Sequence, residues 1–248
     1  MLLFAIISAV LATDSLERQY SQALAQAKYP SYSKISRSLT PITSFNPDLN
    51  FDSYGRVLMA HFGVLSSFNY SVGDSFPLKD IIWLTVFPDL KKSCVEYPKN
   101  KTLRTLQALG MPPTNPSDGV VELYVSMQDI FRPCPDPEIS DRECQVEIPL
   151  LGTTSHKHTP WYCPKQGEAI QQQSAEWVKV NEAHLTWMCN NWLNSYNKSE
   201  VFSNYPWTAL GYTYDWGGSN YVGLSEFIAK KGALVTLHSI SSTEDYCE

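Results

Sequence analysis

The sequence predicts an α+β fold, in which a mixed or mostly antiparallel sheet, or sheets, combines with an N-terminal helix and one long helix, and disulfides link the chain. Strand-like segments dominate the middle and the end of the chain, and helical periodicity concentrates near its start and in residues 168–196. In a protein with a parallel sheet, strands and helices alternate regularly along the chain. The strand-like and helical segments of this chain do not. A length of 248 residues with 43% hydrophobic and 18% charged residues fits one compact domain.

The first twelve residues, MLLFAIISAVLA, have the character of a short signal peptide. They are apolar, and small side chains, Val10 and Ala12, stand where a signal peptidase that cuts after Ala12 would require them. The alternative is a hydrophobic N-terminus buried in the fold. We expect residues 1–12 to be removed and residues 13–248 to form a single secreted domain. No other apolar run reaches the ~18 residues that a membrane span needs, so no span is expected.

Helices are predicted at three places. The capping-box pattern Asp14-Ser-Leu-Glu17 precedes apolar residues at helical spacing, and Pro30 ends this first helix. A short helix over KTLRTLQA is followed by Gly110. The longest helix spans residues 168–196, where we expect His184 to be a buried, hydrogen-bonded residue rather than a ligand.

Strands are predicted where β-branched and apolar residues concentrate between turn-forming residues. A loop rich in Ser, Thr, Pro and Asn, residues 31–52, precedes the first of them. The predicted strands are 54–65, 80–87, 119–127, and, after the long helix, the segments TALGYTYDW, VGLSEFIA and GALVTLHSI.

The six cysteines indicate disulfides, because their number is even and none forms a Cys-x-x-Cys pair. Disulfides in turn indicate an oxidising compartment. Six cysteines allow 15 pairings. We predict one pair, Cys134 with Cys144, because the loop CPDPEISDREC is rich in turn-forming residues, and we expect Arg132 beside it to pair with Asp136 or Glu138. The other pairings stay open.

Three Asn-x-Ser/Thr sequons, at Asn69, Asn100 and Asn197, would accept glycans in a secreted protein, and their occupancy stays open.

Charge and motifs exclude several functions. The formal charge is −6 and no run of Lys or Arg exceeds two residues, so we expect no nucleic-acid partner. Phosphate loops, dinucleotide-binding glycine motifs, nucleophile elbows and zinc-protease motifs are all absent from the sequence. His156 and His158 could share one face of a strand, but no clear third ligand accompanies them, so no metal and no bound cofactor are predicted.

The candidate site residues cluster near the C-terminus, in PWTALGYTYDWGGSNYVGLSEF. Glu226 opens an apolar strand there, and Tyr212, Tyr214 and Trp216 alternate along one strand face, with Trp207 nearby. The alternatives are that Glu226 is a solvated strand-opening residue and that the aromatic residues form one buried sheet face.

The segment SEFIAKKGALVTL resembles the last motif of the ADP-ribosyltransferase superfamily, in which a catalytic Glu precedes an apolar strand, a turn and a second strand. GRVLMAHFG resembles the family's opening strand through Arg56 or His61. IWLTVFPDLKKSC and VVELYVSMQDIF resemble its later segments. FRPCPDPEI and PWTALGYTYDWG also resemble segments of uncharacterised secreted bacterial proteins, which imply no activity.

Two features depart from the superfamily pattern. Arginine-modifying members need a carboxylate where this chain has Leu224, so transfer to arginine is disfavoured. The candidate for the Ser-Thr-Ser element, Thr153-Thr-Ser155, lies 71 residues before Glu226.

The resemblance implies a secreted enzyme that cleaves NAD⁺, as a glycohydrolase or an ADP-ribosyltransferase, with NAD⁺ as substrate and water or an extracellular protein as acceptor. It implies that Glu226 stabilises the cation-like sugar of the transition state, that Arg56 pairs with the pyrophosphate or His61 contacts a ribose hydroxyl, and that the aromatic residues hold the nicotinamide.

Two alternatives stay open. The domain could be a carbohydrate-binding or surface-binding module that presents Trp207, Tyr214 and Trp216. It could also be a glycoside hydrolase that uses Asp215 and Glu226 about 5 to 10 Å apart. The sequence does not determine the oligomeric state.

Overall fold

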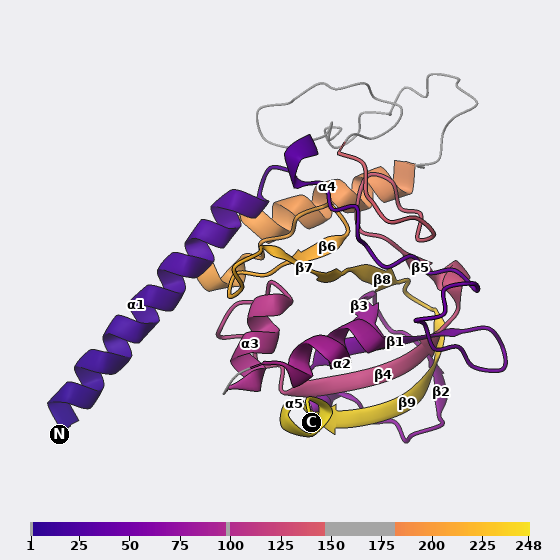
Figure 1. Cartoon of the computed structure of the whole chain (residues 1–248), viewed down its shortest axis with the longest axis horizontal. Coiled ribbons are helices and arrows are strands. Elements are labelled where there is room, and N and C mark those ends of the chain that lie inside the picture. The colour runs from indigo at the N-terminus through magenta and orange to yellow at the C-terminus, as the bar shows by residue number, and fades with distance from the viewer. Residues whose placement is uncertain (1, 98–99, 147–181) are drawn as a thin grey trace.

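The predicted α+β class is confirmed by the structure, a computed structural model that describes residues 2–97, 100–146 and 182–248. A seven-stranded antiparallel sheet and a separate two-stranded sheet combine with an N-terminal helix and a second long helix (Figure 1). In chain order the elements are α1 (Leu2–Ala27), η1 (Tyr32–Lys34), β1 (Val57–Gly63), η2 (Leu65–Ser67), β2 (Ser75–Pro77), β3 (Ile82–Val86), α2 (Phe87–Val95), α3 (Lys101–Ala108), β4 (Gly119–Val125), η3 (Met127–Asp129), β5 (Ile130–Phe131), α4 (Glu182–Tyr196), η4 (Val201–Ser203), β6 (Tyr212–Tyr214), β7 (Val222–Ser225), β8 (Phe227–Ala229), β9 (Leu234–Ser242) and α5 (Thr243–Tyr246).

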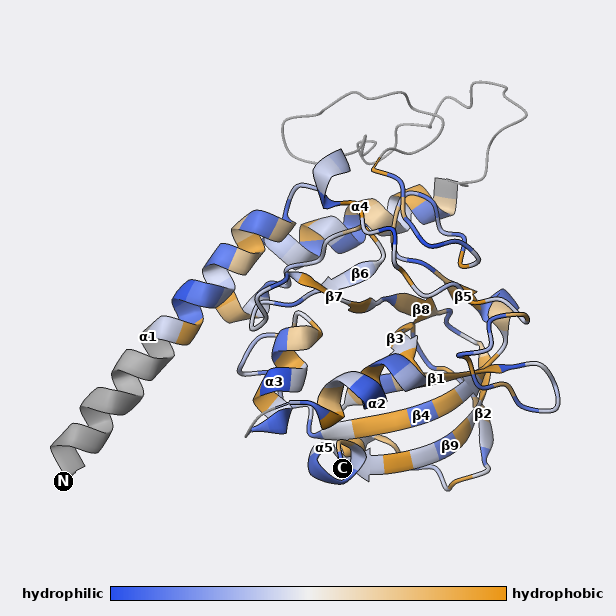
Figure 2. Cartoon of the chain, viewed as in Figure 1, coloured by the Kyte–Doolittle hydropathy of each residue, from blue (hydrophilic) through white to orange (hydrophobic). Residues whose placement is uncertain are grey.

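The large sheet has the strand order β2-β9-β4-β1-β3-β8-β5. Its centre is the pairing of β1 with β4, which runs in one continuous register from Val57 opposite Val125 to Gly63 opposite Gly119. Both strands are hydrophobic along most of their length, as the orange stretches of β4 in Figure 2 show, because both faces of the sheet are covered.

Helices α2 and α3 cover one face of the sheet. Ala60 and Phe62 of β1 pack there against Leu90 of α2 and Leu106 of α3. The predicted strand 80–87 ends at Val86, and the chain turns directly into α2, which apolar periodicity did not predict. Pro88 lies in the first turn of α2, where proline is tolerated because the first backbone N–H groups of a helix have no partner within it.

Helix α1 packs its second half against the two-stranded sheet. Tyr20, Ala23 and Ala27 contact Tyr214 and Trp216, so the predicted amphipathic stripe is used. The Tyr20 hydroxyl donates to the backbone oxygen of Asn204 at 2.8 Å. The helix begins earlier than predicted, at Leu2, so the expected cut after Ala12 falls inside it.

Helix α4 includes the second half of the predicted long helix, and residues 168–181 lie outside the described residues. Its buried side chains, Leu185, Met188 and Trp192, pack with Trp207. His184 is half-buried, and its Nε2 lies 2.8 Å from the backbone oxygen of Cys134, the hydrogen-bonded role that was expected.

The predicted strand VGLSEFIA is wrong as one strand, because it divides at Glu226. Its first part, β7, pairs with β6, where Ser225 lies opposite Tyr212. Its second part, β8, pairs with β3 in the large sheet, where Phe227 lies opposite Leu84. Glu226 is the residue at which the chain crosses from one sheet to the other.

Two disulfides close the fold. These are the two bonds for which both cysteines are described: the predicted bond between Cys134 and Cys144 is confirmed, and Cys94 bonds Cys247 and so ties the C-terminus to α2. Arg132 has a fully buried side chain and pairs with Asp141 at 2.7 Å, not with Asp136 or Glu138 as predicted. The guanidinium also donates to four backbone oxygens, those of Thr40, Ile139, Asp141 and Glu143, so it organises the whole disulfide loop from inside.

Within the part of the chain that the structure describes, no helix has the length and apolar character needed to cross a membrane. The three sequon asparagines, Asn69, Asn100 and Asn197, are exposed.

Candidate active site

One cavity of about 470 Å³ lies between α4, the strands β1 and β3, and the crossing at Glu226. This volume is in the range of small-molecule sites. Its mouth is formed by exposed residues around the end of α4, including Asn194, Lys198 and Ser203. Its deep part is formed by buried residues, including Thr85 and Glu226. The cavity therefore has a solvent-facing end and an end enclosed by buried residues, which we call the dry end.

Glu226 brings a carboxyl group into the dry end. Its backbone N–H donates to the backbone oxygen of Gly211 at 2.9 Å, which fixes the crossing point. Its Oε2 atom is buried and makes no hydrogen bond. Burial raises the pKa of the carboxyl from 4.5 to about 8, and the indole of Trp207 lowers that pKa by a smaller amount. A buried acceptor without a partner is rare in folded proteins, and one that lies in a cavity and has a shifted pKa is a candidate functional group.

The side chain of Ser225 anchors the residue before Glu226. Its hydroxyl oxygen accepts a hydrogen bond from the backbone N–H of Thr40 at 2.7 Å. The Thr40 hydroxyl in turn donates to Asp89 Oδ2 at 2.5 Å. This chain of bonds ties the Glu226 segment to the N-terminal turn of α2.

His61 and Thr85 line the cavity from neighbouring strands of the large sheet. The Nδ1 atom of His61 lies 2.9 Å from the backbone oxygen of Trp83, which can only accept, so Nδ1 carries the proton and Nε2 is an acceptor in the neutral ring. Burial lowers the His61 pKa, which favours this neutral form. Thr85 is buried and its hydroxyl makes no hydrogen bond.

Aromatic side chains form much of the cavity wall. Trp83 and Trp207 meet edge to face with ring centroids 6.4 Å apart, and Tyr205 and Tyr214 complete the wall toward the mouth. Such walls suit a flat ring.

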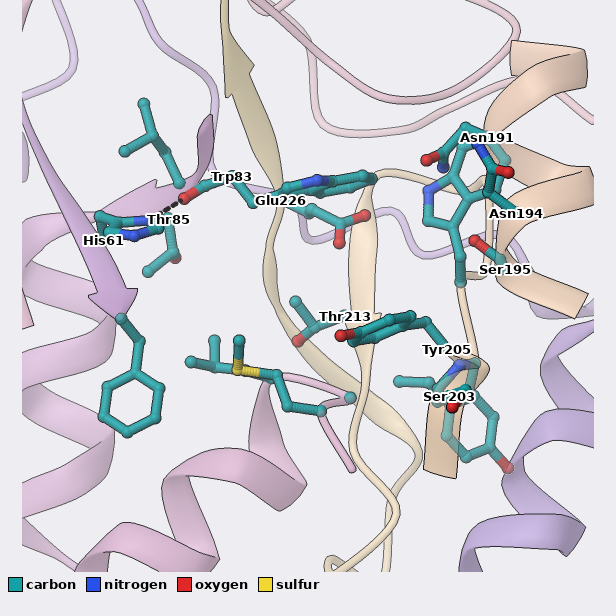
Figure 3. A pocket seen from close by; sticks show the side chains of 18 of the residues that line it. His61, Trp83, Thr85, Asn191, Asn194, Ser195, Ser203, Tyr205, Thr213 and Glu226 are labelled. Carbon is teal, nitrogen blue, oxygen red and sulfur yellow. Dashed lines mark hydrogen bonds between the residues drawn. The ribbon is translucent and has the colours of Figure 1, made fainter. Parts of the chain in front are cut away.

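Helix α4 and the residues that follow it supply a polar wall that was not predicted. Asn191, Asn194 and Ser195 of α4, and Lys198 just beyond its end, line the cavity, and the buried Nδ2 of Asn191 makes no hydrogen bond. Figure 3 shows Glu226 between His61 and Thr85 on one side and the α4 residues Asn191, Asn194 and Ser195 on the other. The spacing of Asn194 and Ser195, three and four residues after Asn191, was the available signal, because it places them on one helix face.

Of the predicted site residues, the cavity brings together Glu226, His61, Trp207 and Tyr214. Arg56 lies outside its lining. The Arg56 guanidinium pairs with Asp52 at 2.6 Å and donates to the Thr236 hydroxyl at 2.7 Å, so its donors are used by these two residues and not by the cavity.

Tyr212 and Trp216 also lie outside the lining. Both are buried, and their polar atoms donate to backbone oxygens, those of Lys34 and Met111 respectively. Asp215 accepts two hydrogen bonds from the guanidinium of Arg104, at 2.9 and 2.6 Å, and does not line the cavity.

Several residues of the sequence predictions lie outside the described residues, namely Thr153-Thr-Ser155, His156 and His158, together with one of the six cysteines, Cys163. Among the residues that are described, no group of three or more His, Cys, Asp or Glu side chains could hold a metal ion.

No protein-family model, curated protein or solved structure gives a significant match to this chain. Its function must therefore be argued from the cavity itself.

Proposed function

We propose that this protein is a secreted enzyme that cleaves the nicotinamide–ribose bond of NAD⁺, with Glu226 as the catalytic carboxylate. The observation that carries the proposal is the Glu226 carboxyl, which is buried at the dry end of a substrate-sized cavity with one oxygen free of hydrogen bonds. In such a place a carboxylate stabilises developing positive charge far more strongly than it would in water.

The reaction with water is a simple displacement at the ribose carbon. The carbon–nitrogen bond breaks and its electron pair goes to the ring nitrogen, which gives neutral nicotinamide. The ribose carbon becomes cation-like, water adds to it, and one proton leaves to solvent, so the products are ADP-ribose, nicotinamide and a proton. Glu226 faces the cation-like sugar and stabilises it as the bond breaks.

The cavity suits the two unlike ends of this substrate. Trp83 and Trp207 offer apolar ring surfaces for the nicotinamide at the dry end, and the neutral His61 offers an acceptor for a ribose hydroxyl. The exposed Lys198 at the mouth is the cation placed to pair with the pyrophosphate, the role that was expected of Arg56.

The alternatives fit the geometry less well. A binding module needs exposed, coplanar aromatic rings, whereas Trp207, Tyr214 and Trp216 are all buried. A glycoside hydrolase based on Asp215 and Glu226 needs both carboxylates at one cavity, whereas Asp215 is held by Arg104 outside the lining.

Secretion is supported by the disulfides of the described residues, because such bonds persist in oxidising compartments. The exposed sequon asparagines fit the same proposal, and in a glycosylating host they would carry glycans.

The test is to incubate the oxidised protein with NAD⁺ and to measure nicotinamide release by chromatography. We expect release by the unaltered protein and a loss of at least about 100-fold for Glu226→Gln, which keeps the size but not the charge of the side chain. Glu122→Gln is the matched control, because Glu122 is also buried but bonds Ser239 in the large sheet and does not line the cavity. No release by the unaltered protein, or equal release by Glu226→Gln, would refute the proposal.

A further inference from the structure

The Glu226 carboxyl lacks a cationic partner in the structure. Among the described residues, no Lys, Arg or His forms an ion pair with it. The carboxylates Asp52, Asp141 and Asp215, in contrast, each pair with an arginine. Within residues 2–97, 100–146 and 182–248, Glu226 is therefore a buried acid without a counter-charge.

The titratable groups that surround Glu226 do not fill this gap. From β1, His61 is held neutral, with Nδ1 on the backbone oxygen of Trp83. From α4 and β6, burial raises the pKa values of Tyr196 and Tyr214, so both phenols are neutral. Tyr205 and Lys198 lie at the exposed mouth. As far as the described residues go, the dry end of the cavity thus has one carboxylic acid and no fixed positive charge.

The Glu226 carboxyl therefore has two protonation states, and the occupant of the cavity decides between them. With the cavity empty, the acid keeps its proton at neutral pH, because ionisation would leave an unpaired charge in an apolar space. With a cation in the cavity, the ionised form gains a partner and is favoured. A neutral ligand of the same shape offers no such gain.

We propose that the cavity selects a flat ring that carries its own positive charge, and that this ring becomes the counterion of Glu226 as the carboxyl releases its proton to solvent. Choosing the N-alkylated pyridinium of NAD⁺ as that ring rests on the proposed function. The enzyme thus acquires its catalytic carboxylate only when the substrate is bound, and the carboxylate lies beside the bond that breaks.

The coupling makes binding depend on pH in a defined direction. When binding releases one proton, the affinity rises about tenfold for each unit of pH below the pKa of the empty site, and it becomes constant above that pKa. We expect this slope for a cationic ring between about pH 6.5 and 7.5, with a plateau above about pH 8. A neutral ring should show no such rise.

The probe pair is the 1-methylnicotinamide cation and neutral nicotinamide, neither of which contains a bond that the enzyme can cleave. Isothermal titration at pH 6.5, 7.5 and 8.5, in phosphate and in Tris, counts the protons released, because the two buffers differ in ionisation enthalpy. We expect close to one proton released per bound cation at pH 6.5, less at pH 8.5, and tighter binding of the cation than of nicotinamide at pH 7.5.

Glu226→Gln should release no proton and should lose the preference for the cation, whereas Glu122→Gln should behave as the unaltered protein does. The inference is overturned if the cation does not bind, if it binds without proton release, or if Glu226→Gln releases protons as before. NAD⁺ cleavage without proton-linked binding would remove this inference and leave the proposed function. Proton-linked binding without NAD⁺ cleavage would remove the proposed function and leave this inference.

Discussion

At the scale of single residues, the burial of the Glu226 carboxyl should make the stability of the folded protein depend on pH. In the unfolded chain the carboxyl titrates near pH 4.5, and in the folded protein near pH 8. Between these values the folded state binds the extra proton, so stability falls as pH rises through this window. Above pH 8 the buried charge remains as a penalty of at most about 5 kcal/mol, since one pKa unit corresponds to about 1.4 kcal/mol.

We therefore expect Glu226→Gln to be about as stable as the unaltered protein at pH 5, and more stable at pH 9 by several kcal/mol. The glutamine has no charge to bury, so the difference should grow steadily between these limits. Thermal unfolding of both proteins across this range gives the measurement, and the difference curve cancels the titration of the histidines. Glu244→Gln, at an exposed position, should show no growing difference. Parallel curves for Glu226→Gln would contradict the assigned burial.

Residue chemistry also explains which candidate residues could be chosen from sequence. Glu226 and His61 stood out because a carboxylate and an imidazole are chemically distinctive, and both line the cavity. Thr85 and Asn191 did not stand out, because isolated Thr and Asn residues are common everywhere in proteins. What distinguishes them is a buried polar atom without a partner, and burial is a tertiary property.

At the scale of elements, the crossing between β7 and β8 depends on Gly211. Its backbone oxygen accepts the N–H of Glu226, and its φ of 72° is in the left-handed region that favours glycine. A β-carbon there would lie 2.6 Å from Cys144 Sγ and 2.7 Å from Arg132 Cδ, both of which are in buried side chains.

We predict that Gly211→Ala lowers the free energy of unfolding by at least about 3 kcal/mol, because backbone strain and a clash in a packed region add together. Gly232→Ala isolates the strain, since Gly232 has a φ of 83° and a β-carbon there would meet no atom within 4 Å. It should cost only about 1 to 2 kcal/mol. Denaturant titrations of both variants measure the difference. Equal losses would mean that the region around Gly211 yields to the extra methyl group.

Local sequence patterns predicted individual elements better than their connections. The apolar spacing in α1 and α3, and the β-branched runs of β1, β3 and β4, are signals within single segments, and all five elements form, although α1 begins earlier than predicted. Helix α2 was not predicted, because a proline at this position is compatible both with the first turn of a helix and with the end of a strand.

At the scale of the whole molecule, the two described disulfides close loops of very different length. Cys94 and Cys247 are 153 residues apart, whereas Cys134 and Cys144 are 10 apart. A crosslink reduces the entropy of the unfolded chain more when the loop is longer. The Cys94–Cys247 bond should therefore contribute more to stability than the Cys134–Cys144 bond does.

We expect the double variant Cys94→Ala/Cys247→Ala to lose about 5 kcal/mol, and Cys134→Ala/Cys144→Ala about 3 kcal/mol. All four side chains are buried to a similar degree, so the loss of packing should be comparable in the two variants. Urea unfolding of both under oxidising conditions tests the order. A larger loss for the short loop would show that its contacts with Arg132 outweigh the entropy of closure.

By itself the sequence determined the α+β class, most helices and strands, the Cys134–Cys144 bond and the choice of Glu226 and His61 as candidates, because each depends on nearby residues or on side-chain chemistry. Only the tertiary structure decided that VGLSEFIA divides between two sheets, that Asp52 and Thr236 hold Arg56 away from the cavity, and that one face of α4 lines it. These outcomes depend on contacts between residues as far apart as Arg56 and Thr236, which are 180 positions apart in the chain. No local pattern encodes such contacts, since they follow from how strands and helices satisfy their hydrogen bonds and bury their apolar faces together.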